Sequence, residues 1–84
     1  MSKDDTITDY ALSGFSVSPA ERLAVVLRHS QETSLNSLAR KLRLRRSENL
    51  YQIKKGNNNI SVPLARRITE AYPQFNVGWL ITGM

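Results

Sequence analysis

The chain has no cysteine and only one histidine among its 84 residues. Without cysteine it cannot form a disulfide framework, a thiolate nucleophile or a cysteine-ligated zinc site. His29 alone cannot make a catalytic triad or a metal site, so we expect it to be a surface or cap residue. Candidate carboxylates are scattered, and no glycine-rich loop is suited to hold a phosphate. We therefore expect no enzyme activity, no metal, no cofactor and no small-molecule ligand.

Long apolar runs are also missing from the sequence. The longest contain only a few residues, and the mean hydropathy is −0.37. This pattern predicts neither a membrane span nor a signal peptide, so we expect no membrane partner and a cytoplasmic location. A chain of this length forms one domain at most, and size scaling predicts that it buries only about 60% of its unfolded surface.

Acidic residues are scarce in the region where basic residues gather. The formal net charge is +5, and residues 1–18 hold Lys3 against Asp4, Asp5 and Asp9, which leaves +7 for the remainder. The seven basic residues between positions 40 and 55, opposed there only by Glu48, are Arg40, Lys41, Arg43, Arg45, Arg46, Lys54 and Lys55. Such a concentration of one sign favours a polyanion partner over the alternative, a solvated helix face.

These charges lie on a stretch that predicts two short helices, at about 35–42 and 47–55, joined by a tight connection. The inward apolar residues would be Leu38, Ala39 and Leu42 in the first helix, and Leu50 and Ile53 in the second. Leu44 in the connection would fix the angle between the helices. Ser47 would cap the second helix with its hydroxyl, and Gly56 would end it. The side chains left outside would be Arg46, Glu48, Tyr51, Gln52 and Lys55. Two helices in this arrangement are typical of a helix-turn-helix.

The rest of the chain predicts further helices and no strand. Residues 1–18 lack helical periodicity and suggest a flexible or lightly docked arm, with Phe15 or Val17 packing on the body. Ser18 and Glu21 form a capping box for a helix over 19–30. Ser34 (or Thr33) would cap the helix at 35–42, Ser61 a helix that stops before Pro73, and Asn76 a last helix over 77–81 that Gly83 closes. We therefore expect an all-α, compact five-helix domain over 19–84.

With these elements in hand, the chain resembles the lambda-repressor-like, or Xre-type, helix-turn-helix DNA-binding domains. The matching residues are Leu38, Ala39, Leu42, Leu44, Leu50, Ile53, Lys55, Gly56, Ile60 and Ser61. The ending YPQFNVGWLITG is similar to the YP-x-x-N-x-x-WLLTG ending of a phage-repressor-like branch. The resemblance covers about residues 19–84. It implies a lambda-repressor-like fold and sequence-specific binding of double-stranded DNA by a transcriptional regulator, a repressor or its N-terminal domain, associated with the nucleoid.

The chain departs from that family in two places within the connection. Many members have glycine after the first motif helix, where this chain has Arg43. A left-handed conformation costs a non-glycine residue roughly 1–2 kcal/mol, so either that strain is tolerated or the turn has another geometry. The segment from Leu44 to Ile53 is also one residue longer than in the commonest members, which leaves the start of the second helix open by one position.

The resemblance implies which residues would contact DNA. The second motif helix, at about 47–55, would lie in the major groove. The base contacts would come from Arg46, Ser47, Glu48, Tyr51 and Asn58, and the phosphate contacts from Asn36, Ser37, Arg40, Lys41, Arg45, Gln52, Lys54 and Lys55. Three alternatives stay open: a salt bridge between Glu48 and Arg45, a partial core role for Tyr51 and a turn-forming role for Asn58.

The same resemblance implies a homodimer on a palindromic operator, with Val77, Ile81 and Met84 as the candidate dimer surface and Trp79 in the core. In that branch a second domain for oligomerisation or self-cleavage usually follows. An alternative function with the same fold is a DNA-binding antitoxin, or protein-interaction module, of a toxin–antitoxin pair, which a neighbouring toxin gene would distinguish.

Overall fold

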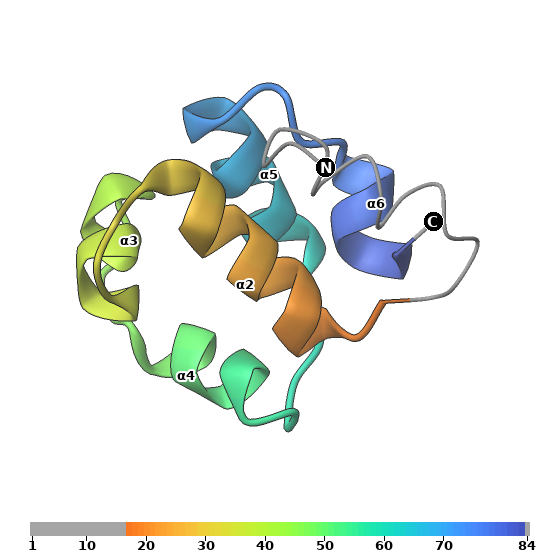
Figure 1. The fold of residues 1–84 in the computed structure, drawn as a ribbon, viewed down its shortest axis with the longest axis horizontal. Coiled ribbons are helices and arrows are strands. Elements are labelled where there is room, and N and C mark those ends of the chain that lie inside the picture. Colours follow the sequence, from red (N-terminus) through yellow and green to blue (C-terminus); the bar gives the residue numbers. More distant parts are fainter. Residues whose placement is uncertain (1–16, 84) are drawn as a thin grey trace, which may run out of the picture.

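Five α-helices make up the regular structure of residues 17–83, the part of the chain that the computed structural model describes (Figure 1). They are α2 (Pro19–Ser30), α3 (Leu35–Lys41), α4 (Glu48–Lys54), α5 (Val62–Ala71) and α6 (Val77–Thr82). No strand occurs in residues 17–83, which confirms the predicted all-α class. Most of the predicted arm, including Phe15, and also Met84 lie outside the described residues.

Side-chain caps start four of these helices, as the sequence predicts. Ser18 and Glu21 form a reciprocal capping box at α2, and Ser34 forms one with Ser37 at α3. At α5 the Ser61 hydroxyl accepts the Leu64 N–H, and at α6 the Asn76 side chain accepts the Trp79 N–H. These bonds satisfy helix N–H groups that have no partner within the helix, so each start is fixed by local sequence.

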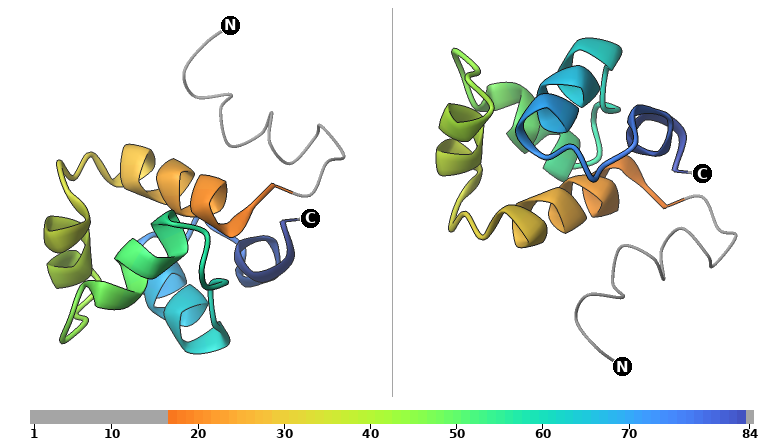
Figure 2. Two further views of the ribbon diagram at one scale, coloured as in Figure 1. Left: turned by 90° about the horizontal axis from the view of Figure 1, so that it is seen from below. Right: turned by 90° about the horizontal axis from the view of Figure 1, so that it is seen from above.

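Helix α2 runs through the middle of the molecule and packs against α3, α4 and α6, while α5 packs against α6. Figures 1 and 2 show α3 and α6 at opposite ends of the fold. The predicted inner faces of α3 and α4 are confirmed, because Leu38, Ala39, Leu42, Leu50 and Ile53 are all buried. Trp79 is buried too and stacks on Phe75, with 6.1 Å between ring centroids, so its predicted core position is also confirmed.

Arg22 is the one charged residue inside the described core, with 2% of its surface exposed. Its guanidinium donates to the Leu80 carbonyl at 2.8 Å, to the Ile81 carbonyl at 3.1 Å, to Asn59 Oδ1 at 2.9 Å and to the Val17 carbonyl. It therefore joins the entry to α2, the loop before α5 and the end of α6. Burial lowers the pKa of Arg22 below its usual value.

Gly83 makes this junction possible because it closes α6 with a φ of +81°. A Cβ at this position would lie 2.8 Å from Arg22 Nη1 and 3.0 Å from the Val17 carbonyl oxygen. Val17 is buried beside it, as the sequence analysis expected of either Val17 or Phe15. No helix of the described region is both long and apolar enough to cross a membrane.

Candidate nucleic-acid interface

The connection from α3 to α4 turns sharply at Arg43, whose φ is +61°. The Arg43 N–H donates to the Arg40 carbonyl at 3.0 Å, and the Leu44 N–H donates to the Ala39 carbonyl at 2.9 Å. This pair of bonds is the Schellman ending of a helix, in which the left-handed residue is usually glycine. Of the two alternatives left open by the sequence, the structure thus shows the strained left-handed turn with arginine in it.

Two contacts then fix how α4 sits against α3. Leu44 is half-buried and packs on the core, as predicted for the residue that sets the angle between the helices. The Ser47 hydroxyl donates to Asn36 Oδ1 at 2.6 Å, which ties the start of α4 to the start of α3. The two helix starts are therefore held side by side.

The predicted hydroxyl cap at Ser47 is wrong. Ser47 precedes α4 but makes no side-chain cap bond, because its backbone is already near-helical, with φ −96° and ψ −3°. A capping residue normally has an extended backbone that aims its oxygen at the first N–H groups. The helix itself runs from Glu48 to Lys54, one residue shorter at each end than the predicted 47–55, and this settles the open position at its start.

The α4 face, defined here as Glu48, Asn49, Tyr51, Gln52 and Lys55, is polar along its whole length. Glu48, Asn49 and Lys55 are exposed, whereas Tyr51 and Gln52 are half-buried. Tyr51 also packs against the core, so its ring has the partial core role that the sequence left open. Asn49 is not among the contacts predicted from the sequence. It stands three residues before Gln52, a spacing that places two amides on neighbouring turns of one helix side.

Arg46 is exposed beside this face and forms an ion pair with Glu48, with 3.7 Å between Arg46 Nη1 and Glu48 Oε1. The salt bridge of Glu48 with Arg45, one of the alternatives left open by the sequence, is not formed, since Glu48 pairs with the next residue, Arg46. Both side chains are about 80% exposed, and solvent screening makes such a pair weak. It is the one ion pair found within residues 17–83, so the other basic side chains there have no carboxylate partner among those residues.

The loop after α4 folds back onto the α4 face. Asn57 Nδ2 donates to Gln52 Oε1 at 2.8 Å, and Asn58 Nδ2 donates to Asn49 Oδ1 at 3.2 Å. Gly56 begins the loop with a φ of +88°. Asn58, a predicted base contact, thus lies next to α4 and is hydrogen-bonded to it. It also lies in the loop after α4, in keeping with the turn-forming role that was its alternative.

At the start of α3 only one of the two predicted phosphate contacts presents a polar group outward. Asn36 is exposed. The Ser37 hydroxyl donates to the Ser34 carbonyl at 2.9 Å and accepts the Ser34 N–H at 3.3 Å, so the capping box occupies its only proton. Leu35 is buried, which leaves Asn36 as the residue that links this end of α3 to the surface of α4.

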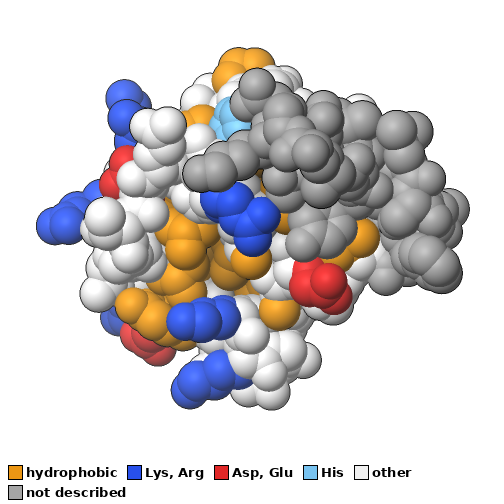
Figure 3. Space-filling model, viewed as in Figure 1, with side chains coloured by type: hydrophobic (Ala, Val, Ile, Leu, Met, Phe, Trp, Pro, Cys, Tyr) orange, Lys and Arg blue, Asp and Glu red, His pale blue; other side chains and the backbone are white. Residues whose placement is uncertain are grey.

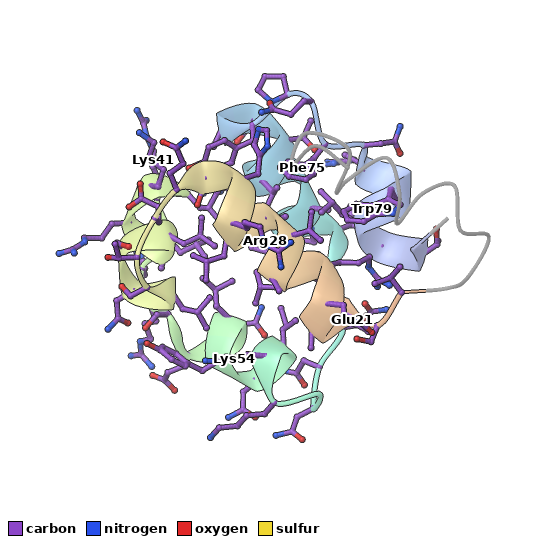
Figure 4. All side chains as sticks on the ribbon, viewed as in Figure 1. Glu21, Arg28, Lys41, Lys54, Phe75 and Trp79 are labelled. Atoms are coloured by element: carbon purple, nitrogen blue, oxygen red, sulfur yellow. The ribbon has the colours of Figure 1, made fainter. Side chains whose placement is uncertain are left out.

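The predicted phosphate contacts do not form one surface. Arg40 and Lys41 lie at the far end of α3, and Figure 4 shows Lys41 well away from Lys54 on α4. They line what we name the α3–α5 groove, of about 670 Å³, together with Leu42, Arg43, Arg67, Glu70 and Ala71. A second, smaller hollow of about 350 Å³, the α4–α5 groove, is lined by Leu44, Arg45, Arg46, Asn49, Ser61, Pro63, Leu64 and Arg67.

Basic side chains consequently project in two directions. Figure 3 shows Lys and Arg side chains along the edge formed by α3 and again around α4, with a further group near the middle of this face, where Figure 4 labels Arg28. Near the α4 face are Arg45, Arg46, Lys54 and Lys55, and along the α3–α5 groove are Arg40, Lys41, Arg43 and Arg67. Arg67 lines both grooves, and the sequence analysis did not single it out because it lies in α5, far along the chain from the basic stretch.

The single histidine has a structural role. His29 is exposed on α2, meets the rings of Phe75 and Tyr72 edge-on at 5.2 and 6.4 Å between centroids, and contacts the Gln74 side chain. No group of three or more His, Asp or Glu residues suited to a metal ion occurs within the described residues.

Comparisons with protein-family models, with curated proteins and with solved structures find no match to this chain.

Proposed function

We propose that this chain binds double-stranded DNA in a sequence-specific manner, as a transcriptional repressor or its DNA-binding domain, with α4 in the major groove. The observation that carries the proposal is the α4 face. It is an unbroken polar surface on a helix whose other side is fully buried at Leu50 and Ile53. The helix is held against α3 by the turn at Arg43 and the bond between Ser47 and Asn36. A rigid polar helix face is what direct contact with base edges requires.

The side chains of this face match particular bases. Asn49 and Gln52 carry amides, which pair with the N6 and N7 edge of adenine. Arg46 donates to guanine, and Glu48 accepts from the cytosine amine. Because Arg46 and Glu48 are 3.7 Å apart, they are spaced to contact the two bases of one G·C pair together. Ser47 and Tyr51 flank these groups, and Asn58 extends the surface through its bond to Asn49.

Phosphates on either side of the groove would be held by Asn36, Arg45, Lys54 and Lys55, which surround the α4 face. These contacts fix the position of the domain on DNA without selecting sequence. One domain covers half a site, so a homodimer on a palindromic operator remains part of the proposal. Val77 and Ile81, the described part of the candidate dimer surface, are each half-buried on α6 at the opposite end of the fold from α3.

The test is selection of bound sequences from a pool of random duplex DNA, followed by titration of the selected duplex. We expect one preferred motif and an affinity that exceeds that for unrelated duplex by at least 10³-fold, the lower end for specific binders. Recovery of no motif, or equal affinity for every duplex, would contradict sequence-specific binding. The variant Asn49→Ala removes an amide from the α4 face. It should lower affinity for the selected motif and leave affinity for unrelated duplex unchanged.

A further inference from the structure

The α3–α5 groove is unusual in what lines it. Three of its residues are arginines, Arg40, Arg43 and Arg67, one is Lys41, and all four are exposed. Glu70 lies in the same groove but stays more than 4 Å from each of these cationic groups, since the only ion pair of the described residues is that of Arg46 with Glu48. The groove thus holds four cations against one carboxylate that pairs with none of them, and the cations repel one another unless an anion joins them.

The groove does not face in the same direction as the α4 face. Helix α3 meets α4 at its first turn, where Asn36 is bonded to Ser47, and Lys41 is its last residue. Seven helical residues span roughly 10 Å, so the end of the groove at Arg40 and Lys41 lies about one helix length from the point where α3 meets α4, whereas Arg67 also lines the α4–α5 groove. Lys41 and α4 lie at different edges of the molecule in Figure 4. A straight duplex on the α4 face therefore does not reach Arg40 or Lys41, and a bent one would have to be deformed at an elastic cost.

The lining indicates which kind of anion the groove suits. A protein partner is usually anchored by apolar or aromatic side chains, but here Leu42 is buried, Ala71 is half-buried and no aromatic residue lines the hollow. The lack of aromatic rings also disfavours a single strand, whose bases stack on them. Arginine side chains, which fork onto two oxygens of one phosphate, suit the backbone of a duplex.

We propose that the α3–α5 groove binds the phosphate backbone of a second DNA duplex, so that one domain holds two duplexes together. The inference rests on the proposed function, because the first duplex is the one seated on the α4 face. Contact with the second duplex involves no base edges and is independent of sequence. If four phosphates are neutralised, the affinity for the second duplex should fall on the order of 100-fold between 50 and 200 mM salt.

The test uses the full chain, an immobilised operator duplex and a second, dye-labelled duplex of unrelated sequence. With the operator saturated by protein, we measure how much labelled duplex is captured. The double variant Arg40→Gln/Lys41→Gln removes two cations that line only the α3–α5 groove. It should lower capture on the order of 50-fold at 0.1 M salt, while affinity for the operator changes less than twofold. The matched variant Lys54→Gln/Lys55→Gln removes the same charge beside α4 and should weaken operator binding instead.

A second variant separates loss of binding from loss of folding. Arg43→Gly removes a groove cation and also relieves the left-handed strain, so the domain should melt at a higher temperature while capture of the second duplex falls about eightfold. A damaged fold cannot produce that combination of results.

The outcomes distinguish this inference from the proposed function. If no variant alters capture, the groove does not hold the second duplex, and the duplexes are instead joined by two protein chains that pair with each other. That result overturns the groove proposal. If poly-glutamate occupies the groove more tightly than duplex at equal charge, the site belongs to an acidic protein, and the proposal is again overturned. If the operator binds and no second duplex is captured, only the groove proposal fails, whereas loss of all duplex binding by the native chain refutes the proposed function.

Discussion

Replacing Arg43 with glycine should stabilise the domain even though it removes a side chain. Arg43 has a φ of +61°, which costs a residue with a Cβ about 1–2 kcal/mol. Glycine removes that cost but gains conformational freedom in the unfolded chain, which offsets about 0.4–1 kcal/mol. Both backbone bonds of the turn, from the N–H groups of residues 43 and 44, are kept. The net gain is about 0.5–1 kcal/mol, or a rise in Tm of roughly 2–8 °C for a domain of this size.

The assay is thermal and urea denaturation of matched variants. Arg43→Ala removes the same charge but keeps a Cβ, so the difference between the glycine and alanine variants isolates the backbone term. Arg40→Gly places glycine three residues earlier, within α3, and should lower the free energy of unfolding by about 0.5–1 kcal/mol. Gln31→Gly repeats the test at the other non-glycine residue with positive φ in the described chain. If Arg43→Gly is less stable than Arg43→Ala, the left-handed turn is wrong.

Three further expectations concern DNA and the core. The slope of log K against log salt for the operator should be about −3, because three basic residues, Arg45, Lys54 and Lys55, would contact phosphates, and a slope near zero would contradict the DNA proposal. Arg46→Ala should lower the free energy of binding to the operator by about 1–3 kcal/mol and remove the preference at one base pair, whereas Lys55→Ala should weaken binding to all sequences alike. If both variants lose affinity equally on every sequence, Arg46 contacts only a phosphate. Arg22→Met should lower the free energy of unfolding, measured in urea, by about 2–4 kcal/mol, because it leaves buried carbonyl groups without a donor. Arg28→Met, at an exposed position of the same helix, should lower it by less than about 0.5 kcal/mol. Similar losses for both variants would contradict the buried junction.

Local patterns in the sequence were enough to predict much of the fold. The caps at Ser18, Ser61 and Asn76 depend on residues three apart, and the inner faces of α3 and α4 depend on helical spacing. Such signals act within a few residues, so the sequence contains them directly. The all-α class and the bounds of α2 followed from the same local reasoning. The expected flexible arm and the dimer contact at Met84 lie outside the described residues and stay predictions.

Features that depend on distant parts of the chain escaped prediction. Arg22 was not recognised as a core residue, because its partners at Leu80 and Ile81 are 58 and 59 positions away. The division of the basic residues into two surfaces depends on α5, which brings Arg67 and Glu70 beside Arg40. The pairing of Glu48 with Arg46 rather than Arg45 turned on a single residue of register. Chain topology decides such contacts, and a pattern of residue types does not encode it.

The bonds of Arg22 also suggest an order in which the fold would assemble. The turn at Arg43 and the bond between Asn36 and Ser47 join residues at most 11 apart, whereas Arg22 donates to carbonyls 58 and 59 residues away. Closing the longer loop costs about 1.5 kcal/mol more in chain entropy than closing the shorter one. We therefore expect the α3–α4 pair to form before α6 docks on the Arg22 guanidinium. On the same reasoning we expect the end of α6 to be the last part of the described domain to dock during folding and the first to detach during unfolding.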